Sequence, residues 1–278
     1  MEVKNILVPV DFSACSKNAL KIAIQLARKC GAKIHLVNAV HIHAPHPDYS
    51  GGVILDSILT DYEAQVQQSF DELESEIVEL KDIPHESDKF VAYLTDAIQA
   101  MATSRNIDLV VMGTRQDHSQ LDHLEGTHAS DVIEISDVPV LVIPESVSVF
   151  EPKTIAFASD FVKITGYGSV GILVWLARLF QSEILVFHIA SDISEMDMLQ
   201  DMHMEEIQEI LRDIPSSVRT LEFDSIEKGI SHFLETHPVD LLAMLARRHN
   251  LFARLFKKSH TKAIAIDSKI PLLTFHEM

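Results

Sequence analysis

One loop of the sequence has the residue types needed to bind a phosphate group. Gly113 ends a short apolar segment, and a glycine at that point lets the chain turn tightly. Gly126 and Thr127 come later and begin the next predicted helix. Backbone N–H groups at a helix start, with a threonine hydroxyl beside them, form an anion-binding site. The loop therefore indicates phosphate binding, although the same pair is also typical of a simple helix cap.

A carboxylate follows the first apolar segment of the chain. Pro9, Val10 and Asp11 stand at the end of this segment. In open α/β sheets, ligands bind beyond the carboxyl ends of the strands, at the point where the strand order reverses. Asp11 and the loop after Gly113 are the two segments that fit this location, so we expect a ligand there.

Alternating strands and helices must position these residues. Short, almost wholly apolar runs are typical of strands buried on both faces, and apolar residues three or four apart indicate helices. Ser13 can cap a helix that Gly31 ends. Further helices are predicted over 53–80, 96–105 and 126–135, and strands over 5–10, 34–40, 90–94, 109–112 and 138–143. This order predicts an α/β fold whose parallel sheet is covered on both faces.

The chain repeats this unit. The offset between matching segments is 149 positions at Asp11 and Asp160, but 132 at Asp108 and Asp240. The first copy therefore carries extra residues, which we assign to the segment HIHAPHPDYSGG. A chain of 278 residues also fits two domains of ordinary size. We predict a tandem duplication with a short, proline-bracketed linker between domains at 1–146 and 151–278.

Several of these motifs together are similar to those of a known family. They are the opening ILVPVDFS, the strand end DLVVMG, the spaced Gly126-Thr127 pair and the closing DVPVLVIPE. The sequence resembles the universal stress protein family in its form with two domains in tandem. The resemblance implies two doubly wound, five-stranded parallel sheets of the adenine nucleotide alpha hydrolase-like type. It also implies that the last strands, 138–143 and 269–274, pair at their edges and make a pseudo-dimer within one chain.

The resemblance further implies an ATP site in the first domain. Nucleotide-binding members of the family hold the ATP phosphates with the pattern G-x2-G-x9-G-[ST] after the fourth strand. Gly113, Gly126 and Thr127 match that pattern. In the family, the aspartate after the first strand contacts the ribose, and Asp11 matches this residue. The expected function is a stress-response module that binds ATP or a related adenine nucleotide.

The resemblance also assigns an adenine contact and exposes one mismatch. Ala39 or Val40, at the end of the second strand, falls where the family's adenine-contacting residue lies, and Pro9 ends the first strand. Gln116 stands at the middle glycine position, where a side chain adds strain or bulk. Arg115 could supply compensating charge. The alternatives are a nucleotide-free interaction module with a lost ATP site, and a slow ATPase, for which no general base is identifiable near the loop.

The second domain departs further from the phosphate pattern. Leu245, Arg248 and Lys258 occupy its three glycine positions, and only Ser259 is kept. Bulky side chains there predict a degenerate domain that pairs with the first and does not bind ATP in the family's manner. A basic cluster surrounds these positions and could bind an anion or an acidic partner, or could face solvent opposite the acidic first domain. Its members are Arg247, Arg248, Arg254, Lys257, Lys258 and Lys262.

Composition and charge argue against several classes of function. Hydrophobic residues make up 47% and charged residues 23% of the chain, which is typical of a globular protein. A net charge of −18 should repel nucleic acid and anionic membranes. We expect a cytoplasmic protein, since no signal peptide and no stretch of about 20 apolar residues is seen. Cys15 and Cys30, on one predicted helix, lie too far apart for a disulfide. A homodimer of the whole chain is compatible with the sequence, which does not determine it.

Other suggestive motifs are interpreted as structural, and neither a metal site nor a catalytic residue is predicted. The G-x-G-x-x-G segment at 166–171 begins too far after its strand for a dinucleotide site. Zinc needs three or four converging ligands, and no cysteine lies near the chain's histidine groups. Those groups are His41, His43 and His46 in the first insertion, and His118, His123 and His128 in the phosphate loop.

Overall fold

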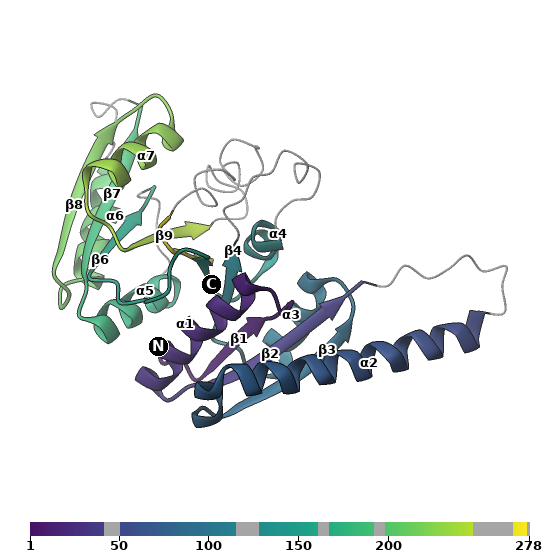
Figure 1. The fold of residues 1–278 in the computed structure, drawn as a ribbon. Coiled ribbons are helices and arrows are strands. Elements are labelled where there is room, and N and C mark those ends of the chain that lie inside the picture. The colour runs from purple at the N-terminus through teal and green to yellow at the C-terminus, as the bar shows by residue number, and fades with distance from the viewer. Residues whose placement is uncertain (42–50, 115–127, 161–166, 192–197, 247–268, 277–278) are drawn as a thin grey trace.

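The computed structural model describes residues 1–41, 51–114, 128–160, 167–191, 198–246 and 269–276. Strands and helices alternate along these ranges, as the apolar pattern predicts (Figure 1). The first half contains β1 (Asn5–Pro9), α1 (Ala14–Cys30), β2 (Lys33–Val40), α2 (Gly51–Glu76), the short 3-10 helix η1 (Val78–Asp82), β3 (His85–Val91), α3 (Leu94–Ser104), β4 (Leu109–Thr114), α4 (His128–Ile135) and β5 (Val140–Pro144).

The second half repeats this order of elements. It contains β6 (Thr154–Ala158), α5 (Tyr167–Phe180), β7 (Glu183–Ala190), α6 (Met198–Ile210), β8 (Ser216–Glu222), α7 (Ile226–Thr236), β9 (Leu241–Ala246) and β10 (Leu272–His276). In this half too, the strands alternate with helices in the described ranges, which is what a duplicated unit requires. The domain borders at 146 and 151 stay a prediction.

Two element bounds predicted for the first half were wrong. The helix predicted over 53–80 ends at Glu76 and is followed by η1, and β3 begins five residues before the predicted position 90. The segment HESDK at the start of β3 is polar, which hid it from a search for apolar runs. β3 lies at the edge of the sheet, where polar side chains can reach solvent.

The strands form one ten-stranded sheet in the order β3-β2-β1-β4-β5-β10-β9-β6-β7-β8. Within each half the paired strands are parallel, and β5 and β10 pair antiparallel where the halves meet. Val142 lies opposite Leu272, and Val140 lies opposite Thr274. The pairing of the two last strands that the sequence predicted is therefore confirmed. It covers two buried, largely apolar edges that would otherwise invite aggregation.

Two apolar layers cover the sheet, one on each face. Buried residues of α1, α2, α5 and α6 share one layer with alternate strand residues such as Ile6 and Val8. Buried residues of α3, α4 and α7 share the other layer with Leu7 and Val37. Since the side chains of a strand alternate between faces, the near-continuous apolar strands supply both layers. The predicted α/β class, with helices on both faces of a parallel sheet, is confirmed.

Matching carboxylates hold the first strand of each half. Asp108 Oδ2 accepts hydrogen bonds from the backbone N–H groups of Lys4 (2.8 Å) and Asn5 (2.9 Å) at the start of β1. Asp240 Oδ2 does the same for Lys153 (2.8 Å) and Thr154 (2.9 Å) at the start of β6. These aspartates are the pair found 132 positions apart in the sequence. The duplication therefore extends to individual hydrogen bonds.

The linker between the halves is held against α1. Asn18 Nδ2 donates to the Val147 carbonyl oxygen at 2.8 Å. Further along α1, Gln25 Oε1 accepts from the Phe150 N–H at 3.2 Å. The buried Phe150 ring packs edge-on against Phe180 of α5, with ring centroids 5.5 Å apart. The linker is thus part of the packed structure, and it connects α1 to the second half.

A charged cluster lies at the amino-terminal edge of the first half. His35 is 3% exposed, and its Nδ1 lies 2.8 Å from Glu86 Oε1. Lys33 bonds the other Glu86 oxygen, and Arg105 Nε lies 3.4 Å from Oε1. Burial lowers the pKa of the His35 imidazole, and this effect outweighs the negative charge of Glu86, which raises the pKa. The hydrogen bond from Lys33 lowers the pKa of the Glu86 carboxyl.

Removing either anchoring carboxylate should destabilise the fold. In Asp108→Ala or Asp240→Ala, two backbone N–H groups at the start of a strand lose a charged acceptor, which costs about 1–3 kcal/mol of unfolding free energy. Urea titration measures this loss. Asp71→Ala, on the exposed face of α2, is the matched control and should change stability by less than about 0.5 kcal/mol. Equal midpoints for Asp108→Ala and Asp71→Ala would contradict the anchoring role.

The charged cluster predicts that acid destabilises the protein. A histidine with a lowered folded pKa stabilises the fold fully above its ordinary value of 6.5, and this contribution is lost as the pH falls. A glutamate with a lowered pKa loses its contribution as the pH falls below 4.5. In His35→Gln, the urea midpoint should therefore fall less between pH 6.5 and pH 5 than it does in the wild-type chain. If the urea midpoint of this variant falls with pH as steeply as that of the wild-type chain, His35 is not the source of the acid destabilisation.

Candidate functional site

The predicted ligand residues of the first half gather at one edge of the sheet. β1 pairs with β2 on one side and with β4 on the other, so the strand order reverses between β1 and β4. Because these strands are parallel, their carboxyl ends lie at the same edge (Figure 1). Asp11 follows β1, and Gly113 is the penultimate residue of β4. The structure therefore brings Asp11 and Gly113 to the switch point, where ligands bind in such sheets.

The turn after β1 fixes the position of Asp11. Its Oδ1 accepts hydrogen bonds from the Ser13 N–H (3.0 Å) and the Ser13 hydroxyl (2.6 Å). Ser13 also caps α1 by accepting from the Ser16 N–H at 3.3 Å, as the sequence predicted. Phe12, between them, has a left-handed φ of 62°, and its ring packs edge-on against Phe70. The exposed Asp11 carboxylate is thus held at the start of a helix.

Gly113 lets α1 approach the end of β4. A Cβ atom added at Gly113 would lie 2.5 Å from Cys15 Sγ and 2.6 Å from the Cys15 carbonyl oxygen. No side chain fits this space unless the backbone of α1 moves. Gly113 was predicted as a phosphate contact, and the structure gives it a second role, which is to seat the first turn of α1 beside β4. Cys15 and Cys30, both on α1, are free thiols as predicted.

The predicted adenine contacts end the neighbouring strand. Ala39 and Val40 are partly buried at the end of β2, opposite Phe90 and Val91 of β3. Pro9 ends β1 and lies opposite Val37, two residues before Ala39. These residues flank the same carboxyl edge as Asp11. The first half therefore offers partly apolar strand ends beside an exposed carboxylate.

Polar residues at this edge were missed by the sequence analysis. Asn38 Nδ2 donates to the Val10 carbonyl oxygen at 2.8 Å. The hydroxyl of Tyr62, on α2, donates to Asn38 Oδ1 at 2.8 Å. An amide within the otherwise apolar run 36–40 is the signal that could have revealed Asn38. Tyr62 had no comparable signal, because its contact depends on the path of α2.

Several predicted residues lie outside the described residues. They include four predicted residues of the phosphate loop, namely Arg115, Gln116, Gly126 and Thr127. The same holds for the histidines at 43, 46, 118 and 123, and for the basic cluster from Arg247 to Lys262 with Ser259. His41 is described, and its ring stacks on Tyr93 with centroids 4.0 Å apart. In the described ranges, no three His, Cys, Asp or Glu side chains are arranged to hold a metal ion.

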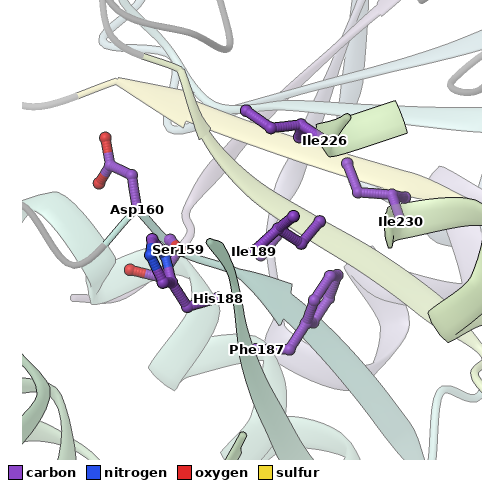
Figure 2. Close-up of a pocket in the computed structure, with 8 residues that line it drawn as sticks. Ser159, Asp160, Phe187, His188, Ile189, Ile226 and Ile230 are labelled. Carbon is purple, nitrogen blue, oxygen red and sulfur yellow. Dashed lines mark hydrogen bonds between the residues drawn. The ribbon is translucent and has the colours of Figure 1, made fainter. Parts of the chain in front are cut away.

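The second half has a small hollow at the matching edge. Figure 2 shows Ser159, Asp160 and His188 on one side of it and the apolar side chains on the other. The apolar side is formed by Ala158, Phe187, Ile189, Ile226 and Ile230. The expectation that bulky residues fill the phosphate loop of the second domain concerns Leu245, Arg248 and Lys258, none of which lines this hollow. The hollow lies between residues of α7 and the carboxyl ends of β6 and β7.

The phosphate side of the second half differs from that of the first. Leu245 occupies the place of Gly113 in β9 and is buried in the apolar layer shared with α5. Since even a Cβ at Gly113 meets the first turn of α1, a leucine excludes the same approach. The two edges are therefore built differently where the phosphates are expected.

These features define a tandem α/β protein whose sheet has a switch point in each half. The family model described as Universal stress protein family matches residues 2–144. The chain therefore belongs to the universal stress protein family. Comparison with curated proteins gave no match. In the part of the chain that the structure describes, no helix has the length and apolar character needed to span a bilayer.

Solved structures share the fold over almost the whole chain. A universal stress protein from Archaeoglobus fulgidus DSM 4304 has a TM-score of 0.73 and 17% identity, with 99% of this chain and 97% of that chain covered. The cytoplasmic domain of a prokaryotic cation chloride cotransporter has a TM-score of 0.54 and 9% identity, covering 99% of this chain and 95% of that one. At these identities, the likeness shows the two-part fold alone.

Adding one methyl group at Gly113 should test the packing of α1 on β4. Gly113→Ala is expected to lose about 1–3 kcal/mol of unfolding free energy, because the new Cβ overlaps the Cys15 backbone. Chemical denaturation measures the loss. Gly171→Ala is the matched control, since its Cβ meets only the Met1 side chain at 3.4 Å and alanine favours the helix. Equal stability of the two variants would contradict the close approach.

Proposed function

We propose that this chain is a stress-response module whose first half binds ATP or a related adenine nucleotide. The proposal rests on one observation: Asp11 and Gly113 both lie at the switch point of the first half. Asp11 is exposed and oriented there by Ser13. A carboxylate at that point suits the hydroxyl groups of a ribose, and it leaves the adjoining loop for phosphates.

The proposed roles follow from the positions of the residues in the chain. Ala39 or Val40 contacts the adenine, and Pro9 supports the turn that carries Asp11. The phosphates lie against Gly113, Gly126 and Thr127, with Arg115 adding positive charge near Gln116. An adenine nucleotide would thus have an apolar contact for its base and backbone N–H donors for its phosphates.

We assign the second half, 151–278, to pairing with the nucleotide-binding half, 1–146. Leu245 supports this division, because it occupies space that Gly113 leaves to α1 in the first half. Most of the side chains that line the hollow beside Asp160 are apolar. Because β5 and β10 pair within the chain, a homodimer would have to use another surface. We place the protein in the cytoplasm, without nucleic acid or membrane partners, in keeping with its net charge of −18.

A second candidate function is a nucleotide-free interaction module. Gln116 favours it, because a side chain replaces the middle glycine of the family's phosphate pattern. If Gln116 weakens the site, Gln116→Gly should increase nucleotide affinity by roughly tenfold. A slow ATPase would release phosphate faster than the variant Gly126→Arg, whose side chain fills the phosphate loop. Equal phosphate release by both proteins rejects the ATPase.

Matched aspartate variants test the proposed site. Asp11→Asn keeps the size of the side chain but removes a charged acceptor for a ribose hydroxyl, so calorimetry should show a loss of ATP affinity of about tenfold or more. Asp160→Asn, at the same position of the second half, should leave the affinity unchanged. Absence of binding heat at millimolar ATP with folded wild-type chain would reject the nucleotide-binding proposal. Equal losses in both variants would reject the assignment to the first half.

A further inference from the structure

The residue before Asp11 is held from two sides. The Val10 N–H donates to the Val37 carbonyl oxygen of β2 at 2.8 Å. The Val10 carbonyl oxygen accepts from Asn38 Nδ2, also at 2.8 Å. Residues of β2 therefore bind both the backbone N–H and the backbone carbonyl of Val10. Because Asp11 comes next in the chain, these two bonds fix the point from which its carboxylate reaches the edge of the sheet.

Tyr62 sets the direction in which the Asn38 amide points. Its hydroxyl has one proton and donates it to Asn38 Oδ1 at 2.8 Å, the shorter of its two polar contacts. With Oδ1 committed as an acceptor, Nδ2 faces the Val10 carbonyl. Burial raises the pKa of the Tyr62 hydroxyl, so it keeps its proton at neutral pH. The chain of bonds runs from α2 through β2 to the residue before Asp11.

The second half has the same bond with a different side chain. His188 Nδ1 lies 2.9 Å from the Ser159 carbonyl oxygen, and Ser159 precedes Asp160 (Figure 2). The Ser159 N–H donates to the Phe187 carbonyl oxygen at 3.0 Å. Since a carbonyl can only accept, Nδ1 of His188 carries the proton and donates it.

The strand registers show that Asn38 and His188 are equivalent. Pro9 lies opposite Val37, and Ala158 lies opposite Phe187. In each half, the donor side chain is the next residue of the second strand. The two halves therefore differ in residue type at this position but keep one chemical requirement, which is a side-chain N–H aimed at the carbonyl before the aspartate.

We propose that Asn38 is a positioning residue for the nucleotide site, acting through the Val10 carbonyl to hold Asp11. The proposal rests on the proposed function, because Asp11 is the ribose contact assigned there. Asn38 itself need not touch the ligand. The position requires a nitrogen donor, and either an amide or an imidazole supplies it.

An exchange of side chains between the halves tests this proposal. Asn38→Asp keeps the size and the acceptor for Tyr62 but cannot donate to the Val10 carbonyl. Asn38→His copies the donor of the second half. We expect Asn38→Asp to lose ATP affinity by roughly tenfold, the effect of one lost bond to a buried acceptor, and Asn38→His to recover most of it. Asn38→Leu, without charge, should behave like Asn38→Asp.

A measurement without nucleotide separates this proposal from the proposed function. Amide hydrogen exchange of residues 10–13 should be roughly tenfold faster in Asn38→Asp than in the wild-type chain, and restored in Asn38→His. Gln25→Leu is the control, since Gln25 bonds the linker backbone away from this edge. It should leave both the exchange of residues 10–13 and the ATP affinity unchanged.

Each outcome of the experiment bears on the proposal. Wild-type exchange and affinity in Asn38→Asp would overturn it, as would a folded Asn38→His that shows no recovery. If the wild-type chain binds no ATP, the proposed function fails, and the exchange pattern alone then shows whether Asn38 holds the turn. If exchange changes but ATP affinity does not, Asn38 has a structural role only and the proposal is overturned.

Discussion

The close approach of α1 to β4 is the constraint on which the ligand edge of the first half depends. Only a residue without a side chain fits at Gly113, because a Cβ there would lie 2.6 Å from the Cys15 carbonyl oxygen. This contact places the first turn of α1, with its cap Ser13, beside the carboxyl end of β4. Ser13 in turn holds Asp11. One missing side chain thus aligns a helix start, a carboxylate and a strand end at the switch point.

The two halves keep the same scaffold but differ at this contact. Asp108 and Asp240 anchor the first strands in the same way, and the turns after β1 and β6 are each held by a nitrogen donor. Leu245 stands at the position of Gly113, and its side chain occupies the space that Gly113 leaves to α1. The duplication thus preserved the hydrogen bonds that hold the sheet and its turns, while the two ligand edges diverged.

Much of the fold was predictable from the sequence, because buried parallel strands have near-continuous apolar segments and helices have apolar faces. The pairing of β5 with β10 followed from the family resemblance. Ser13 caps the start of α1 and Gly31 caps its end, as predicted. The start of β3 was not predictable, because an edge strand can carry the polar HESDK segment. The contact of Tyr62 with Asn38 and the packing role of Gly113 could not be predicted from the sequence either, since both depend on contacts between distant segments.

The central claim is that only the first half presents a nucleotide site, because only there does a glycine admit the helix start at the end of β4. A photoreactive azidoadenine nucleotide, cross-linked to the whole chain and mapped by peptide mass spectrometry, tests this claim most directly. The account predicts one label per chain, within residues 1–146 and competed by ATP. Labelling of the hollow beside Asp160, or equal labelling of both halves, would contradict it.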